Sequence, residues 1–234
     1  MDKNDLKKYD MFGDIQTNLL PSEKLKEELY AIIKAEPELA KLTRKQPDEP
    51  EDIENNVRFA LEKGETKIYP LIEIPGPWPG HAYVSRMPGY STKIDLDTEL
   101  DAIRDFGITV LINLIPDQDI ADLYRVKGYA EAAKKRFGDQ YINFEIMDYE
   151  PATDDDGFER TVDIASTALW KGQSILSHCG AGCGRTGMFL GCLLVKNGFS
   201  PVDAVKLYRK TRGCGPESQD QLAYISRYKK RVLG

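Results

Sequence analysis

The chain has 234 residues, of which 41% are hydrophobic and 30% charged, and its formal net charge is -6. This composition is typical of a globular domain with its own core and excludes a disordered or collagen-like chain. The mild negative charge argues against a broad nucleic-acid or anionic-membrane surface, and no segment approaches the roughly 20 apolar residues that span a bilayer. We therefore expect a cytoplasmic protein with no membrane segment and no nucleic-acid partner.

The first 65 residues differ in pattern from the remainder. Two stretches with helical spacing, residues 22–42 and 50–64, carry charges on their outer positions, and prolines break the chain between them. Ser22 precedes the first stretch and is a suitable N-cap. The sequence predicts a helical extension over residues 1–65, packed on a main domain formed by residues 66–234.

The main domain alternates apolar β-branched runs with helical patterns. Two strands at its start are separated by the turn-rich segment PGPWPGH. Further strands are predicted over residues 108–115, 141–147 and 173–179, and helices over 98–107, 119–138, 158–172, 185–198, 200–213 and 217–233. Strands that alternate with helices of this length form α/β folds. We expect a central parallel-rich mixed sheet flanked by helices.

The segment with the clearest chemistry begins where the strand 173–179 ends. Cys179 is followed by three glycines at alternate positions, by Arg185, and then directly by a helix. We call residues 179–185 the Cys179 loop. A glycine-rich turn into a helix N-terminus points several backbone N–H groups at one spot and binds an anion of phosphate size. The predicted phosphate-binding residues are Gly180, Ala181, Gly182, Cys183, Gly184 and Arg185.

A thiol in that position is a nucleophile aimed at phosphorus. Cysteines at helix N-termini and beside cations lose their proton more easily than free cysteine, so Cys179 is expected to be a thiolate at neutral pH. Its attack would form a phosphocysteine while the loop amides and Arg185 hold the phosphate oxygens. The Thr186 hydroxyl could donate to the sulfur, and His178 is better placed to fix the loop than to act as a base.

The decapeptide HCGAGCGRTG resembles the signature loop of the protein tyrosine phosphatase superfamily. The segments SRMPG, DQDIADLYRVKGYAEAAKKRFG and GCGPESQDQLAYI are most similar to dual-specificity-type enzymes of the cyclin-dependent kinase-associated phosphatase group. The resemblance spans roughly residues 67–232. It implies hydrolysis of phosphate from phosphotyrosine, phosphoserine or phosphothreonine proteins, without a cofactor or a metal.

The same resemblance implies an aspartate general acid about 30 residues before the cysteine. Asp148 lies 31 residues before Cys179, directly after the strand 141–147, and is the preferred candidate. Asp154, Asp155 and Asp156 are the alternatives, although they also suit the N-terminus of the following helix. No Trp-Pro precedes the acid, which fits the dual-specificity type.

Near the C-terminus, GPESQDQL resembles the glutamine-bearing loop of the family. Gln221 would then orient the attacking water, whereas Glu217 stands where another glutamine is common. The alternative for Gln221 is a plain position on a helix surface.

The four cysteines lie in the C-terminal quarter, which favours free thiols over a disulfide framework. Their spacing matches no common zinc site. Cys183 could form a disulfide with Cys179 under oxidation, or could simply fill a small volume, and Cys192 is expected in the core.

The variable positions of the Cys179 loop are uncharged, which favours singly phosphorylated groups. Tyr69, Tyr83 and Tyr90 could line the cleft. Phosphoinositides, RNA 5′-triphosphates, sulfur or arsenate chemistry and a phosphopeptide-binding module without catalysis stay open as alternatives. The sequence predicts neither the physiological substrate nor the oligomeric state.

Overall fold

The structure is a computed structural model, and it describes residues 22–42, 71–90 and 95–233. The predicted helix over 50–64 lies outside the described residues, as do Tyr69 and the start of the first predicted strand.

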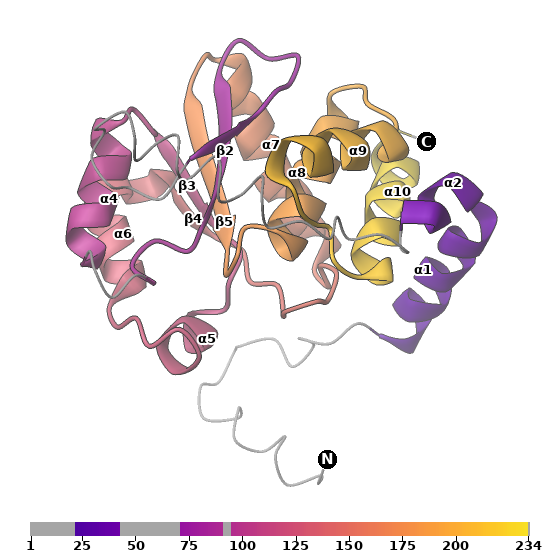
Figure 1. Ribbon diagram of the computed structural model, residues 1–234, viewed down its shortest axis with the longest axis horizontal. Helices are drawn as coiled ribbons and strands as arrows, with labels where there is room; N and C mark the ends of the chain where they lie inside the picture. The colour runs from indigo at the N-terminus through magenta and orange to yellow at the C-terminus, as the bar shows by residue number, and fades with distance from the viewer. Residues whose placement is uncertain (1–21, 43–70, 91–94, 234) are drawn as a thin grey trace, which may run out of the picture.

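A five-stranded mixed sheet forms the centre of the molecule (Figure 1). The strand order is β1-β2-β5-β3-β4; β1 runs antiparallel to β2, and the other neighbours are parallel. The strands are β1 (Ile72–Ile74), β2 (His81–Arg86), β3 (Val110–Asn113), β4 (Tyr141–Asn143) and β5 (Ser174–Cys179). The predicted parallel-rich mixed sheet is confirmed, with β5 in its middle.

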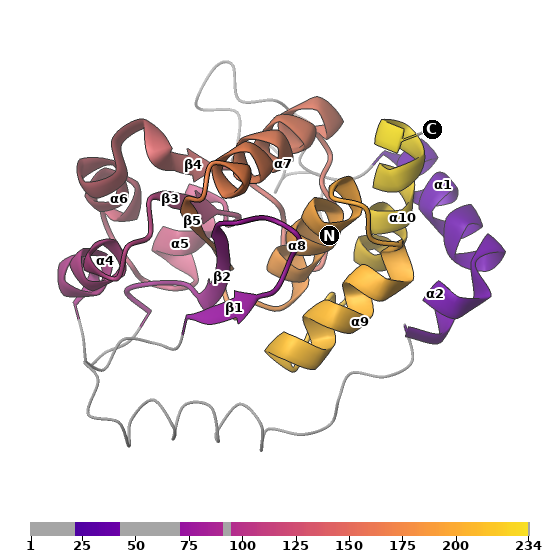
Figure 2. The same ribbon diagram turned by 90° about the horizontal axis from the view of Figure 1, so that it is seen from above.

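Helices cover both faces of this sheet. Figure 2 shows α4 and α6 on one side and α7, α8 and α9 on the other, with α10 packed against α8. The bounds are α4 (Leu96–Asp105), α5 (Asp117–Asp122), α6 (Tyr129–Phe137), α7 (Asp155–Trp170), α8 (Gly184–Lys196), α9 (Pro201–Arg212) and α10 (Gln219–Leu233), and a 3-10 turn covers Gly138–Gln140. Helix α8 is buried from Gly184 to Val195, so it lies inside the domain.

One predicted helix was wrong in its extent. The segment 119–138 forms two helices, α5 and α6, with a connection between them. Arg125 and Gly128 in that connection have φ angles of 58° and 69°, which a continuous right-handed helix does not contain. The break leaves the connection free to approach the Cys179 loop.

The described part of the N-terminal extension forms α1 (Glu23–Ala35) and α2 (Pro37–Lys41), and Ser22 caps α1 as predicted. Both helices lie beside α10 at one end of the domain (Figures 1 and 2). Leu29, Ile32 and Leu39 are buried in this contact, and Arg227 of α10 forms an ion pair with Glu28 at 2.9 Å. The boundary between residues 65 and 66 stays a prediction. No helix within the described ranges has the length and hydropathy of a membrane span.

Candidate active site

Cys179 is the last residue of β5, at the carboxyl edge of the parallel strands, where α/β folds place their sites. Its thiol is free and its exposed fraction is 3%. Gly182 has a φ angle of 71°, and a Cβ atom there would lie 2.4 Å from the Ser85 carbonyl oxygen. Only glycine satisfies both the left-handed backbone and this close approach.

The Cys179 loop is held from outside by hydrogen bonds to its carbonyls. The Tyr208 hydroxyl donates to the Gly182 carbonyl at 2.7 Å, and Arg212 Nη2 donates to the Ala181 carbonyl at 2.7 Å. Since the C=O and N–H of a trans peptide point in opposite directions, the N–H groups of the same two peptides face away from Tyr208 and Arg212. The loop is thus arranged to present backbone donors to an anion, as the sequence predicts for a phosphate site.

The Arg185 guanidinium is almost fully buried beside the loop. Its Nη1 donates to the Ile146 carbonyl at 3.2 Å, its Nη2 lies 3.1 Å from Asp148 Oδ1, and its Nε has no hydrogen-bond partner among the described residues. Burial opposes its charge, but the electrostatic interactions with Cys179 and Asp148 outweigh this and raise the pKa of Arg185. Arg185 therefore stays cationic, with one buried donor left for a phosphate oxygen.

Asp148 follows β4 on the same edge of the sheet and approaches the loop through its ion pair with Arg185. Half of its side chain is exposed, so solvent and a substrate can reach it. The next residue, Tyr149, has a φ angle of 61°, an uncommon backbone conformation for a residue other than glycine, and its N–H donates to Asp148 Oδ1. The structure therefore brings Asp148, Arg185 and Cys179 together; the role of each stays a prediction.

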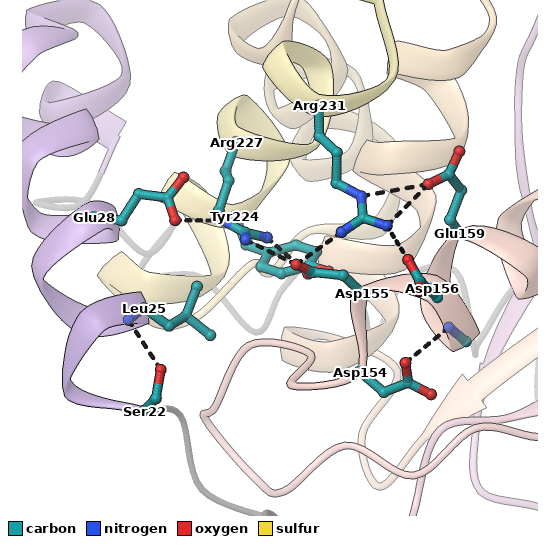
Figure 3. Close-up of polar contacts among 11 residues, drawn as sticks. Ser22, Leu25, Glu28, Asp154, Asp155, Asp156, Glu159, Tyr224, Arg227 and Arg231 are labelled. Carbon is teal, nitrogen blue, oxygen red and sulfur yellow. Dashed lines mark hydrogen bonds and ion pairs between the residues drawn. The ribbon is translucent and has the colours of Figure 1, made fainter.

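Asp154, Asp155 and Asp156, the alternative candidates for the general acid, form contacts elsewhere (Figure 3). Asp154 caps α7 by accepting a backbone N–H at 3.0 Å. Asp155 accepts two hydrogen bonds from Arg227 at 2.7 Å, and Asp156 pairs with Arg231. The contacts of Asp155 and Asp156 join α7 to α10, and the contact of Asp154 matches the predicted helix-capping role.

His178 and Thr186 flank the loop on its buried side. His178 Nε2 forms a 2.6 Å hydrogen bond with the Tyr129 hydroxyl, and burial lowers the pKa of His178 to about 3. A histidine that stays neutral at physiological pH agrees with the predicted loop-fixing role. The Thr186 hydroxyl is buried and has no hydrogen-bond partner in the part of the chain that the structure describes, so its donation to the sulfur stays a prediction.

Gln221 is fully buried, which excludes the alternative of a plain helix-surface position. Its Oε1 accepts from the backbone N–H groups of Glu217 and Ser218 at 2.9 and 3.3 Å, and its Nε2 donates to the Glu150 carbonyl at 3.4 Å. The amide therefore connects the segment after Asp148 with the loop before α10. Its predicted water-orienting role is untested.

The prediction of free thiols was wrong for two of the four cysteines. Cys183 forms a disulfide with Cys214, whereas Cys179 and Cys192 are free, and Cys192 is buried as expected. The proposed pairing of Cys183 with Cys179 is thus replaced by a bond that ties the Cys179 loop to the connection after α9. Spacing could not reveal this pair, because it depends on how α8 and α9 fold back beside each other.

We expect Cys214→Ser to lower stability more than activity. The disulfide closes a segment of 31 residues, for which loop-closure entropy gives about 3–4 kcal/mol. Thermal unfolding with and without dithiothreitol measures this: the reductant should lower the melting temperature of the wild-type protein and leave that of the variant unchanged. Equal melting temperatures for oxidised wild type and variant would contradict the assignment.

Tyr124, in the connection between α5 and α6, lies at the Cys179 loop and was not predicted from the sequence. Its hydroxyl accepts from Arg185 Nη2 at 3.4 Å and occupies the space of a side chain at position 180. Tyr90, one of the predicted tyrosines, packs edge-on against it, with ring centroids 5.3 Å apart. Tyr83 instead packs against Phe106. The sequence did not predict this position, because it placed Tyr124 inside one continuous helix over residues 119–138.

Comparison with known proteins agrees with this geometry. Residues 86–199, which include the Cys179 loop and Asp148, match the family model of a polymorphic toxin system DSP-PTPase phosphatase. A solved structure of kinase associated phosphatase (KAP), with serine in place of its catalytic cysteine, is similar over 73% of this chain and 99% of its own, at a TM-score of 0.63 and 17% identity. The chain has the protein tyrosine phosphatase fold.

Two further structures with this phosphatase fold are similar. Tk-PTP in its active form matches 65% of this chain and 94% of its own, at a TM-score of 0.53 and 22% identity. A putative protein tyrosine phosphatase from Leishmania major matches 69% and 98%, at a TM-score of 0.51 and 23% identity. At these sequence identities the structural matches show only that the fold is shared. The chemistry is argued from the residues of the site.

Proposed function

We propose that this protein is a cysteine-dependent phosphomonoester hydrolase that removes phosphate from phosphoproteins through a phosphocysteine intermediate. One observation carries the proposal: Cys179 ends a central strand at the N-terminus of α8, beside a buried Arg185 that forms an ion pair with Asp148. A nucleophile, an anion cradle and a carboxyl group within one site are the parts that phosphoryl transfer to and from a thiol requires.

In the first step the Cys179 thiolate attacks phosphorus and the bond from phosphorus to the leaving oxygen breaks. The loop N–H groups and Arg185 stabilise the charge on the phosphoryl oxygens. Asp148 donates a proton to the leaving oxygen. In the second step water attacks the phosphocysteine, Asp148 takes the proton back, and the electron pair of the S–P bond returns to Cys179.

We infer a dual-specificity-type substrate range, and a likeness of the chain to the cyclin-dependent kinase-associated phosphatase group. The similarity to kinase associated phosphatase and the uncharged loop positions 180–183 support this inference. A panel of phosphotyrosine and phosphothreonine peptides, a phosphoinositide and a 5′-triphosphate RNA tests it. We expect turnover of the peptides; faster turnover of the lipid or the RNA would identify a different substrate class.

The proposed reaction itself is tested with a chromogenic aryl phosphate. Wild-type protein is expected to hydrolyse it, and Cys179→Ser to abolish turnover while leaving the fold intact by circular dichroism. Binding of a phosphopeptide without hydrolysis by the wild type would instead support a phosphopeptide-binding module.

A further inference from the structure

Tyr124 places its hydroxyl against two residues of the Cys179 loop. Arg185 Nη2 donates to this hydroxyl at 3.4 Å. A Cβ atom at position 180 would lie 2.0 Å from the hydroxyl oxygen, and its three nearest atoms would all belong to the Tyr124 side chain. Since the φ angle of Gly180 is not positive, no backbone turn requires glycine there. Gly180 instead makes room for the tyrosine.

Contacts from two directions hold Tyr124 in this position. Its N–H donates to the Asp119 carbonyl at 3.2 Å. The Tyr90 ring packs edge-on against the Tyr124 ring, and the Arg86 guanidinium lies 5.7 Å from the Tyr90 ring centroid. Arg86 is the register partner of Cys179 in the neighbouring strand β2. The ring of Tyr124 is thus supported from the strand beside the one that carries the nucleophile.

The Tyr124 hydroxyl still has its own proton to donate. A tyrosine hydroxyl is both an acceptor and a donor, and this one accepts from Arg185. It donates to no protein atom within the part of the chain that the structure describes. Burial raises the pKa of Tyr124 more than Arg185 lowers it, so the hydroxyl stays protonated at neutral pH. The side chain is partly exposed, and a ligand in the site can therefore accept this proton.

A phosphoryl group in the Cys179 loop would bring its oxygens close to this proton. Nε of Arg185 is the buried donor left for a phosphoryl oxygen, and it forms one edge of the planar guanidinium together with Nη2, which contacts Tyr124. Gly180 directly follows Cys179 and belongs to the predicted anion cradle. The hydroxyl therefore borders the cradle at two of its residues, in the place where a side chain of residue 180 would otherwise lie.

We propose that Tyr124 is a phosphate-binding residue, whose hydroxyl donates a hydrogen bond to a phosphoryl oxygen. The inference rests on the proposed function and adds a side-chain donor from outside the Cys179 loop to the backbone donors within it. Tyr124 keeps its proton through both steps, and Asp148 still transfers the proton of the leaving and the attacking oxygen. A donor that is fixed before the substrate binds stabilises charge on the phosphoryl oxygens without reorganisation.

Tyr124→Phe removes the hydroxyl and keeps the ring. We expect kcat/KM for a chromogenic aryl phosphate to fall about tenfold to a hundredfold, as for the loss of one hydrogen bond to a charged group. The dissociation constant of tungstate, a stable tetrahedral oxyanion, should rise by a similar factor in calorimetry. Tyr30→Phe is the matched control, because Tyr30 is exposed on α1, and it should equal the wild type in both measurements.

Gly180→Ala tests the same hydroxyl from the opposite partner. Its methyl group would collide with Tyr124 in the wild-type background, where the nearest atoms all belong to that side chain. We expect Gly180→Ala to weaken tungstate binding there by about the factor seen in Tyr124→Phe. In a Tyr124→Ala background the space is open, so the same substitution should cause little further loss.

Unchanged tungstate affinity in Tyr124→Phe would overturn the inference, whether or not kcat/KM falls, because the hydroxyl would then not contact the oxyanion. An equal loss from Gly180→Ala with and without the Tyr124 ring would also contradict it. Binding is measured without turnover, so the two proposals can fail separately. Tungstate binding that depends on Tyr124, in a wild-type protein without hydrolysis, would overturn the proposed function and keep Tyr124 as an oxyanion-binding residue. A wild-type protein that binds no tungstate would overturn both.

Discussion

Arg185→Lys is expected to lower kcat/KM about 10³-fold, although the positive charge is kept. The guanidinium contacts the Ile146 carbonyl, Tyr124 and Asp148 through two nitrogens and leaves Nε for a phosphate oxygen. An ammonium lacks the planar fork of the guanidinium and cannot keep those contacts while it donates to a phosphoryl oxygen. Steady-state kinetics with an aryl phosphate measure the loss.

Arg160→Lys is the matched control for this substitution, because Arg160 is exposed on α7. Its kinetics should equal those of the wild type. Retention of activity within tenfold in Arg185→Lys would show that a point charge suffices and that the guanidinium geometry is not used.

Asp148→Asn is expected to lower kcat about 10²-fold for a substrate with a poor leaving group. The loss should shrink for an activated aryl phosphate, because a stable phenolate departs without a proton. Two substrates that differ only in leaving-group acidity therefore test the acid role and separate it from a general effect on the site.

Asp154→Asn is the control for the acid assignment. Asn caps a helix about as well as Asp, so α7 should be preserved, and neither substrate should be hydrolysed more slowly. A leaving-group-dependent loss in Asp154→Asn, with none in Asp148→Asn, would move the acid to the α7 cap.

The local patterns of the sequence predicted most of this fold. Alternation of β-branched runs and amphipathic helices indicated the mixed sheet, Ser22 marked a helix start, and the glycines of the Cys179 loop placed a turn between β5 and α8. Each of these signals depends on residues that are neighbours in the chain.

The sequence did not predict the contacts that join distant segments, and it predicted one helix where the chain breaks. The left-handed residues Arg125 and Gly128 break a segment whose composition suits one helix, and only the break brings Tyr124 to Arg185. The disulfide between Cys183 and Cys214 likewise depends on the antiparallel return of α9 beside α8. In the site, the sequence predicted the Cys179 loop and Asp148, whereas the contact of Tyr124 with Arg185 required the folded structure.

The central claim is that phosphate passes through Cys179. Rapid acid quench of the protein during turnover of an aryl phosphate, followed by peptide mass spectrometry, tests it directly. The account predicts a phosphate on the peptide that carries Cys179, and none in Cys179→Ser. Sustained turnover by Cys179→Ser, or phosphate found only on another residue, would contradict it.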